Sequence, residues 1–421
     1  RMKSALSVWW NDAIVGTLRL DEHGDTTFDY APDWLADADL PALSRSLPKQ
    51  AEPFDRRRTR PFFAGLLPEE AQRDAVARAL GISKGNDFAF LKALGGDVAG
   101  ALTLWPEGET PPAYDGAVAR EPLGDNALVA MLDALPTRPF LAGDEGLRLS
   151  LAGAQSKIPV VLVDGAIALP APGQPTTHIL KPPMTRFPAT TENEAFSMRL
   201  ASAIGLSVAG VEARRIKDRP FLLVERYDRA IDEGGVARRL HQEDFCQALG
   251  IPPEHKYAAE GGPTFKVGFQ LLRDTTSRPA LEVLKLLDAA IFQLIVGNAD
   301  AHGKNYSLLY GPNGTVLAPL YDLMCTIAYP DVSPKLAMKI AGLATIEDLK
   351  VAPWTQFASD TGLGGAFVRR RVSELAESVR RQVRDVAASL EQGFNSDELR
   401  RYGDIVLTRA EAVADSTRTQ S

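Results

Sequence analysis

The sequence contains little cysteine, few histidines and no long hydrophobic run. Its 421 residues include two cysteines, Cys246 and Cys325, and five histidines. Two cysteines outside any CxxC or Cys/His spacing exclude a disulfide framework and leave a zinc site without support, as in proteins of a reducing cytosol. The most apolar run, 289–296, is far shorter than the roughly 20 residues that span a bilayer. The chain also begins without a secretory signal pattern, so we expect a cytoplasmic protein with no membrane attachment.

Composition and charge describe an ordinary folded protein. Hydrophobic residues make up 45% of the chain and charged residues 24%, which excludes disordered and collagen-like classes. At roughly 150 residues per domain, the length predicts two or three packed units. The net charge of −7 argues against general polyanion binding. One basic cluster is interpreted as a solvated loop, with a phosphate-contacting patch as the alternative: Arg56, Arg57, Arg58 and Arg60.

The order of predicted elements indicates an α+β protein. Alternating apolar residues predict strands within 7–20 and over 26–30, and helical spacing predicts a helix over 69–80. The proline-rich stretch 108–114 is interpreted as a linker. Asp164-Gly165 predicts a hairpin over 157–169, because both turn residues tolerate positive φ.

The rest of the chain becomes mostly helical toward its end. A strand over 178–181, a helix over 192–204 and a strand over 221–224 are predicted in the middle third. Helices are predicted over 281–296 and along the amphipathic stretch 375–390, and the residues from Ser416 are expected to fray.

The stretch after the most apolar helix has the spacing of a kinase catalytic loop. Asp300 and Asn305 stand five positions apart, as in D-x-x-x-x-N. In such loops the carboxylate orients the attacking hydroxyl and the amide oxygen holds Mg²⁺. Taken alone, the pair also fits a turn or a cap. His302, between them, is assigned either to orienting Asp300 or a phosphate, or to a structural hydrogen bond.

A hairpin predicted after this loop favours the catalytic interpretation of Asp300 and Asn305 over a turn or a cap. Strands over 306–310 and 315–320 flank Gly311-Pro312-Asn313-Gly314, and the second strand delivers Tyr321-Asp322-Leu323. Kinases bring their second metal-binding carboxylate beside the first in this way. Asp322 therefore fits a metal ligand, and a strand-end cap is the alternative. Two carboxylates and an amide that converge at one hairpin end need a cation to relieve their repulsion.

Upstream residues could supply the nucleotide contacts. Residues 150–157 form a small-residue loop whose backbone N–H groups could cradle phosphates. Lys181, at a strand end, suits the lysine that pairs with the α- and β-phosphates, and Glu194 on the next helix suits its carboxylate partner. A solvated strand-end lysine is the alternative for Lys181. Backbone groups of Glu225 and Tyr227 are candidates to meet the adenine edge.

These motifs resemble those of the HipA-like serine/threonine kinases, the toxins of HipBA-type toxin–antitoxin modules. The likeness covers nearly the whole chain and rests on motifs in the family's order: 62–69, 149–155, 242–250, 298–305 and 321–323. The resemblance implies a protein-kinase-like bilobal fold. On this resemblance, the chain is expected to divide into three parts. These are a β-rich N-terminal subdomain at 1–107, a nucleotide-binding portion at 108–228 and a helical catalytic lobe at 229–421.

The resemblance also implies roles for individual residues in an ATP- and Mg²⁺-dependent kinase. Asp300 acts as catalytic base, with His302 and Lys181 as further catalytic residues, and Asn305 and Asp322 hold the metal. Ser150 is the position of inactivating autophosphorylation, although Ser156, where Glu is commoner in the family, offers a second hydroxyl. The expected nucleotide-site residues are Ala152, Gly153, Ala154, Gln155, Ser156, Lys157, Lys181, Glu225, Arg226, Tyr227, His302, Gly303, Lys304, Asn305, Tyr321 and Asp322.

The family likeness implies partners as well. These are a small HipB-like helix-turn-helix antitoxin, an aminoacyl-tRNA synthetase as the protein substrate, notably the glutamyl enzyme, and operator DNA reached mainly through the antitoxin for co-repression. Two other functions remain as hypotheses: a small-molecule kinase of related fold, and a catalytically silent DNA-binding co-repressor. The Asp300, Asn305 and Asp322 set argues against the silent protein.

Overall fold

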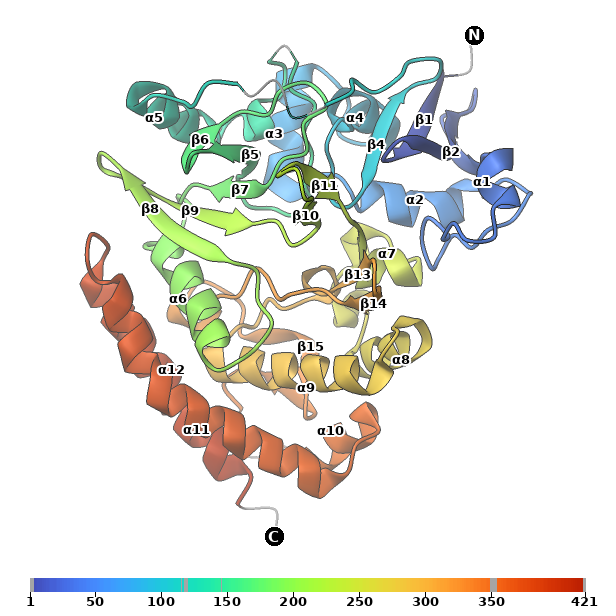
Figure 1. Cartoon of the computed structure of the whole chain (residues 1–421). Helices are drawn as coiled ribbons and strands as arrows, with labels where there is room; N and C mark the ends of the chain where they lie inside the picture. Colours follow the sequence, from blue (N-terminus) through green and yellow to red (C-terminus); the bar gives the residue numbers. More distant parts are fainter. Residues whose placement is uncertain (1–3, 115, 117–119, 145, 349–353, 419–421) are drawn as a thin grey trace. The chain divides into compact units, whose positions relative to one another are not determined.

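The structure is a computed structural model that describes residues 4–114, 116, 120–144, 146–348 and 354–418. It contains both helices and antiparallel sheets, which confirms the α+β class (Figure 1). Contacts divide the chain into two compact units. The first comprises residues 1–182, 216–219 and 223–254, and the second comprises 183–215, 220–222 and 255–421. The three-part division expected from the sequence stays a prediction.

The first unit opens with the predicted β-rich region. Its antiparallel sheet has the order β3-β2-β1-β4 and consists of β1 (Ser4–Trp10), β2 (Ala13–Leu20), β3 (Thr26–Tyr30) and β4 (Leu102–Pro106). Gly16 of β2 faces the ring of Phe28, and a Cβ at this position would lie 2.6 Å from that ring. The close approach of β2 and β3 therefore requires glycine here.

The basic cluster found in the sequence lies in a helix, so its interpretation as a loop was wrong. Helix α2 (Arg56–Ala64) begins after Asp55, whose carboxylate accepts the N–H of Arg58 at 3.0 Å. Its second half carries buried aromatic residues, so packing and the cap stabilise a helix despite the internal proline. Arg60 forms a 2.9 Å ion pair with Asp87 within the same unit.

A second sheet of the first unit contains the predicted hairpin. Asp164 and Gly165 adopt φ values of 50° and 79°, which confirms the two-residue turn. β5 pairs with both β6 and β7, and β9 is next to β7 in the strand order. These strands are β5 (Ile158–Val163), β6 (Ala166–Ala168), β7 (His178–Lys181) and β9 (Arg219–Glu225, of which residues 220–222 are assigned to the second unit).

The remaining elements of the first unit are short. The helices are α1 (Pro32–Ala36), α3 (Glu70–Leu80), α4 (Asp87–Leu94), α5 (Asp125–Ala134) and α7 (Phe245–Leu249), and the strands are β10 (Arg229–Ile231), β11 (Ala237–Arg239) and β12 (His241–Asp244). The helix predicted over 69–80 is confirmed as α3, which ends at Gly81 with a φ of 65°.

The second unit is mostly helical, as predicted. Its helices are α6 (Thr190–Ala203), α8 (Phe265–Thr275), α9 (Pro279–Val296), α10 (Trp354–Thr361), α11 (Gly365–Leu390) and α12 (Ser396–Ser416). Its strands are β8 (Val211–Ile216, the last residue of which is assigned to the first unit), β13 (Ser307–Gly311), β14 (Gly314–Leu317), β15 (Lys335–Ile340) and β16 (Leu343–Thr345).

Helix α9 is the core of this unit. Its last eight residues, 289–296, are all buried, because α8, α11 and α12 pack around it. Figure 1 shows α11 and α12 as neighbouring long helices, and α11 confirms the amphipathic helix predicted over 375–390. The sequence prediction missed α12, although its buried residues have the same spacing of three and four: Leu399, Tyr402, Val406, Ala410 and Val413. The residues beyond 418 lie outside the described part.

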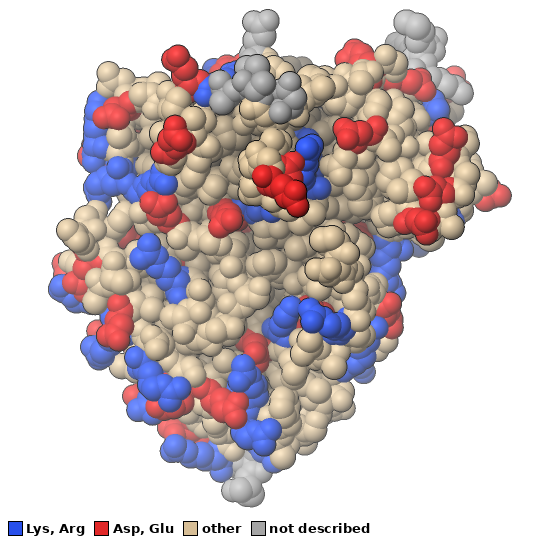
Figure 2. Space-filling view, in the orientation of Figure 1, with Lys and Arg blue, Asp and Glu red and all other residues tan. Residues whose placement is uncertain are grey.

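Charges of both signs are mixed over the surface. On the face shown in Figure 2, basic side chains alternate with acidic ones. Ion pairs such as Arg400–Glu391 at 2.9 Å account for part of this pattern on α11 and α12. No helix within the described ranges is long and apolar enough to cross a membrane.

Candidate active site

In the first unit, the small-residue loop predicted to hold phosphates is docked through its backbone. The N–H of Ser150 donates to the Asp97 carbonyl at 3.0 Å, and the Gly153 carbonyl accepts the N–H of Glu69 at 3.1 Å. The Ser150 hydroxyl donates to the Leu66 carbonyl at 2.8 Å, and Ser150 is completely buried. The expected modification site is therefore enclosed by its own unit in this conformation.

The rest of this loop is folded over the side chain of Lys157. The Lys157 Nζ donates to the Ala152 carbonyl at 2.8 Å. Gly153 has a φ of 111°, and a Cβ at this position would lie 2.8 Å from that Nζ, so both the backbone angle and the space require glycine. Residues 152–156 are half-buried, and the Gln155 amide reaches the Pro182 carbonyl at 3.5 Å.

Two lysines lie at the same end of the second sheet. Ile158 of β5 pairs with Leu180 of β7, and the next positions in this antiparallel register are Lys157 and Lys181. Only 6% of Lys157 and 3% of Lys181 are exposed. Two buried ammonium groups beside a loop of small residues create a positive field that suits phosphate oxygens. The structure thus brings two of the predicted nucleotide residues to one place.

The predicted adenine-binding segment 225–227 leads into a buried network of ion pairs. Glu225 is exposed, and the Tyr227 hydroxyl donates to the Gln242 side chain. The Arg226 side chain points away from solvent and donates to the Val98 carbonyl at 2.9 Å and to Asp228 at 2.8 and 2.9 Å. Sequence reasoning expected Arg226 in the nucleotide site, and the structure uses its guanidinium to anchor this segment.

Asp97 is the centre of this network. Its carboxylate accepts hydrogen bonds from Arg229 at 3.0 Å, from Arg239 at 2.9 Å and from the Thr176 hydroxyl at 2.5 Å, and it forms an ion pair with Arg226 at 3.3 Å. Only 3% of Asp97 is exposed. The whole set, here called the Asp97 cluster, consists of Asp97, Arg226, Asp228, Arg229 and Arg239.

The arginines determine the charge state of both acids. Burial alone would raise the pKa of Asp97, but Arg229, Arg239 and Arg226 outweigh it and lower the pKa to about 2. Arg226 in the same way holds the pKa of Asp228 well below its usual range, against the effect of burial. Both acids are therefore ionised at neutral pH and balance the guanidinium groups.

In the second unit, Asp300 stands at the exit of helix α9. The helix ends at Gly297, which has a φ of 80°, and the backbone N–H of Asp300 donates to the Asn298 side chain at 3.1 Å. The Tyr257 hydroxyl donates to Oδ1 of Asp300 at 2.9 Å. The Asp300 side chain is exposed at the surface of its unit, and Tyr257 holds one of its two oxygens.

Asn305 and His302 are joined in a one-turn helix. The Asn305 amide oxygen accepts the backbone N–H of His302 at 3.0 Å, and Nδ1 of His302 accepts the N–H of Lys304 at 3.3 Å. The ring of His302 lies edge-on to Tyr257, with the ring centroids 5.3 Å apart. A carbonyl-type oxygen has two lone pairs, and the bond from His302 uses one of those of Asn305.

The hairpin β13–β14 brings Asp322 back toward the catalytic loop. The Tyr321 hydroxyl donates to the Lys304 carbonyl at 2.7 Å, which joins the residue before Asp322 to the residue before Asn305. Asp322 has a φ of 54°, in the left-handed region that few residues with a Cβ adopt. The Tyr321 side chain thus joins the two segments, and the convergence of Asp300, Asn305 and Asp322 stays a prediction.

Glu194 is buried in α6, and its pairing with Lys181 stays a prediction. Sequence reasoning missed Asp97 and Tyr257. Asp97 lies in a Gly-Gly-Asp-Val-Ala-Gly stretch that resembles an ordinary turn, and Tyr257 lies in a loop without periodicity. The only local signal was a polar side chain beside small residues, which is common in any loop.

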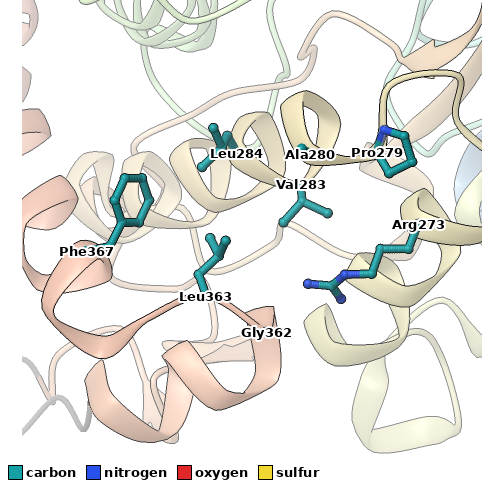
Figure 3. Close-up of a pocket in the computed structure, with 8 residues that line it drawn as sticks. All are labelled: Arg273, Pro279, Ala280, Val283, Leu284, Gly362, Leu363 and Phe367. Atoms are coloured by element: carbon teal, nitrogen blue, oxygen red, sulfur yellow. The ribbon is translucent and has the colours of Figure 1, made fainter.

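The second unit also contains a pocket that is separate from these residues. It has a volume of about 480 Å³ and lies between α8, α9 and the start of α11, where Val283, Leu284 and Phe367 line it (Figure 3). Arg273 is the one charged side chain in its lining. None of the predicted site residues takes part in it.

Comparison with known proteins decides the family. Residues 6–105 match the model of the HipA N-terminal domain, and residues 149–387 match that of the HipA-like C-terminal domain. The chain belongs to the HipA family. The C-terminal match includes the loop at 150–157, Lys181, the loop at 298–305 and Asp322.

Relatives of this HipA-family chain extend over nearly its full length. It is 58% identical to the putative kinase Y4mE of Sinorhizobium fredii, over 97% of this chain and 98% of that protein. It is 30% identical to the serine/threonine-protein kinase toxin HipA of Shewanella oneidensis, over 91% and 90%. A solved complex of HipA, HipB and operator DNA from Shewanella oneidensis MR-1 matches with a TM-score of 0.85 and 28% identity, over 99% and 100%. The protein is accordingly a protein kinase.

The Asp97 cluster should make the stability of the protein change with pH in the acidic range. An acid whose pKa is lowered on folding stabilises the protein above its unfolded pKa of about 4 and loses this effect as the pH falls toward about 2. Asp97→Asn should lower the free energy of unfolding at pH 7 by about 3–5 kcal/mol, because three buried arginines lose a counter-charge. It should also flatten the loss of stability between about pH 4 and 2. Urea unfolding at several pH values measures both effects.

A surface pair provides the control. Asp25 forms a 2.9 Å ion pair with Arg56, and both side chains are largely exposed. Asp25→Asn should lower the free energy of unfolding by less than about 1 kcal/mol. It should leave the loss of stability in the acidic pH range as in the wild type. Equal pH dependence in the wild type and Asp97→Asn would contradict the assignment.

Tyr257 should affect turnover more than stability. Tyr257→Phe removes the hydrogen bond to Asp300 and keeps the ring beside His302. One such bond is worth about 1 kcal/mol, so kcat at saturating ATP should fall roughly fivefold. The phosphotransfer rate and the unfolding midpoint are measured together. Tyr114→Phe, which loses a 3.0 Å bond with Gln174 in the other unit, serves as control. An unchanged kcat in Tyr257→Phe would show that this bond does not orient the carboxylate.

Proposed function

We propose that this HipA-family kinase is an ATP- and Mg²⁺-dependent serine/threonine kinase that acts as the toxin of a toxin–antitoxin pair. The observation that carries the proposal is the 2.7 Å bond from Tyr321 to the Lys304 carbonyl. It joins the segment of Asp322 to the loop of Asp300 and Asn305, which supports the proposal that these three oxygen-bearing side chains lie at the open end of the β13–β14 hairpin. That is the arrangement on which phosphoryl transfer depends.

The donor set of this hairpin end suits magnesium. Asp322 and Asp300 offer carboxylate oxygens and Asn305 offers an amide oxygen, the hard ligands that Mg²⁺ prefers. We assign Asn305 and Asp322 to the metal. When bound, Mg²⁺ would neutralise charge on the phosphates.

Residues of the chain itself bind the nucleotide and handle the proton of the attacking hydroxyl. Asp300 accepts or orients the proton of the attacking hydroxyl, with Tyr257 bonded to its Oδ1 and His302 packed beside Tyr257. In the first unit, Lys181, Lys157 and the N–H groups of the loop at 152–156 bind phosphate oxygens of ATP. Backbone groups of 225–227, which the Asp97 cluster holds in place, meet the adenine edge.

Ser150 is proposed as the site of self-inactivation. Its hydroxyl hydrogen points at the Leu66 carbonyl, 2.8 Å away. A phosphate on this oxygen would remove the donor and bring nearly two negative charges to a carbonyl oxygen in a buried space. Phosphorylated Ser150 therefore cannot stay where it is, and the loop that binds ATP phosphates has to leave with it.

Partners and location follow the family likeness. We propose a HipB-like helix-turn-helix antitoxin as the neutralising partner, because the solved relative of 28% identity is a HipA–HipB–operator DNA complex. Operator DNA would be reached mainly through this antitoxin, for co-repression. As substrate we propose an aminoacyl-tRNA synthetase, in first place the glutamyl enzyme, in the cytoplasm.

Replacing the catalytic carboxylate tests the activity. Asp300→Asn should lower kcat by roughly 10³-fold, because proton transfer by a positioned base contributes about 10²–10⁴-fold. Growth arrest on expression should disappear with it, while the unfolding midpoint and antitoxin binding stay unchanged. Labelled ATP in a cell lysate, followed by gel electrophoresis and mass spectrometry, shows which proteins receive phosphate.

Asp331, an exposed carboxylate after the catalytic hairpin, is the matched control. Asp331→Asn should arrest growth like the wild type. A toxic Asp300→Asn protein would refute the base assignment, and label in small metabolites alone would refute a protein substrate. Label on proteins other than synthetases would refute only the substrate.

The two serines of the loop can be separated by substitution. Ser150→Ala loses only the bond to Leu66, so it should keep its initial rate and no longer inactivate itself during incubation with ATP. Ser150→Asp should lower kcat at least tenfold and speed hydrogen exchange across 150–157, because a buried carboxylate faces a carbonyl. Ser156→Ala should behave like the wild type. Phosphate found on Ser156, with continued self-inactivation of Ser150→Ala, would overturn this assignment.

A further inference from the structure

A buried asparagine clamps the backbone that follows Asp322. Asn193 of α6 is completely buried. Its amide oxygen accepts the N–H of Cys325 at 2.7 Å, and its amide nitrogen donates to the carbonyl of the same residue at 3.1 Å. The second N–H donates to the Tyr329 hydroxyl at 3.1 Å, and the Ser197 hydroxyl approaches the oxygen at 3.4 Å. All the hydrogen-bonding capacity of the amide is therefore used.

The clamped residue is three positions from the proposed metal ligand. Asp322 adopts a φ of 54°, which costs a residue with a Cβ roughly 1–2 kcal/mol unless its neighbours fix it. On its N-terminal side, Leu320 bonds through both backbone groups at 2.9 Å, to the Ser207 carbonyl and the Ala209 N–H. On its C-terminal side, the corresponding two-bond anchor is Asn193. The conformation of Asp322 is thus held from both ends.

The same segment also reaches the start of the catalytic loop. The Thr326 hydroxyl accepts the N–H of Ala299 at 2.8 Å and donates to the Gly297 carbonyl at 3.1 Å. The N–H of Ile327 donates to that carbonyl at 3.1 Å as well. Residues 325–327 are therefore a bridge with Asn193 on one side and the residues before Asp300 on the other.

We propose that Asn193 is a positioning residue for the metal-binding carboxylate. Through Cys325 it fixes Asp322 relative to Asp300, so that the oxygens of both side chains meet the metal and the phosphates in the required geometry. The inference rests on the proposed function of Asp322. It adds a residue that touches neither substrate nor metal, and in the sequence it stands directly beside Glu194, the predicted partner of Lys181.

A purely structural role predicts a different outcome. If Asn193 only satisfies buried polar groups, its loss lowers stability and leaves metal binding unchanged. If it positions Asp322, the affinity for the metal falls, because residues that orient metal ligands typically contribute 10–100-fold. The two roles are separated by measuring metal affinity and stability on the same full-length variants.

The experiment uses Mn²⁺ as a stand-in for Mg²⁺ in the presence of ADP, with binding followed by electron paramagnetic resonance. This readout does not depend on turnover. Asn193→Asp keeps the acceptor for the Cys325 N–H and places an oxygen against its carbonyl. Asn193→Ser is too short to reach Cys325 and adds no charge, so the test does not depend on a buried carboxylate being tolerated. Both variants should bind Mn²⁺ about tenfold more weakly.

Tyr329→Phe is the matched control. It removes the buried Tyr329 hydroxyl that accepts a hydrogen bond from Asn193, and it leaves both hydrogen bonds between Asn193 and Cys325. Its Mn²⁺ affinity should equal that of the wild type, although its unfolding midpoint falls. Destabilised Asn193 variants with wild-type Mn²⁺ affinity would overturn the proposal.

Asp322→Asn distinguishes this inference from the function on which it rests. If Asp322→Asn abolishes Mn²⁺ binding and the Asn193 variants do not weaken it, only the positioning role is refuted. If Asp322→Asn itself binds Mn²⁺ and transfers phosphate normally, the metal assignment fails and the role of Asn193 falls with it.

Discussion

The buried carboxylate of Asp97 joins two parts of the first unit that are far apart in the sequence. Its backbone carbonyl accepts the N–H of Ser150, at the start of the phosphate loop. Its side chain binds Arg226, which lies in the predicted adenine-binding segment 225–227, and Arg229, which follows that segment. A shift of Asp97 would therefore move both segments that are proposed to bind the nucleotide. Because the surrounding charges are almost completely buried, the loss of a single member leaves buried charges without a counter-charge and lowers stability.

In the second unit, neutral side chains join segments that are far apart in the sequence. Tyr321, Thr326 and Asn193 bind backbone groups of distant segments, and none of them carries a charge. Each of these contacts fixes main chain near Asp300 or Asp322. Neutral anchors have a further advantage here, since a charged anchor beside two carboxylates would change their affinity for a metal and for protons. Orientation and electrostatics are thus controlled by different residues.

The parts that could be predicted from the sequence are those with local causes. The turn at Asp164-Gly165 depends on two residues that accept positive φ, and the strand before Lys181 and the buried helix α9 depend on patterns within one segment. The spacing of Asp300 and Asn305 could also be recognised, because both residues lie within one short segment. Helix α2 was missed because Pro61 and a run of arginines favour a loop, whereas the cap at Asp55 and buried aromatic residues stabilise the helix. The roles of Asp97 and Asn193 come from partners about 130 positions away, which no local pattern contains.

The position of Ser150 couples the two states proposed for the loop. Three hydrogen bonds hold the loop to residues 66–69 and Asp97, and they would have to break for the loop to leave. Ser150 donates two of them, to Asp97 and Leu66, and the Gly153 carbonyl accepts the third from Glu69. Residues 152–156 are half-buried, so their departure exposes little apolar surface. The Asp97 cluster can stay intact, because Asp97 loses one backbone bond and keeps all its side-chain partners. On the proposed assignments, phosphate on Ser150 would thus remove the loop at 150–157 while the segment 225–227 remains in place, which would turn the kinase off without unfolding its first unit.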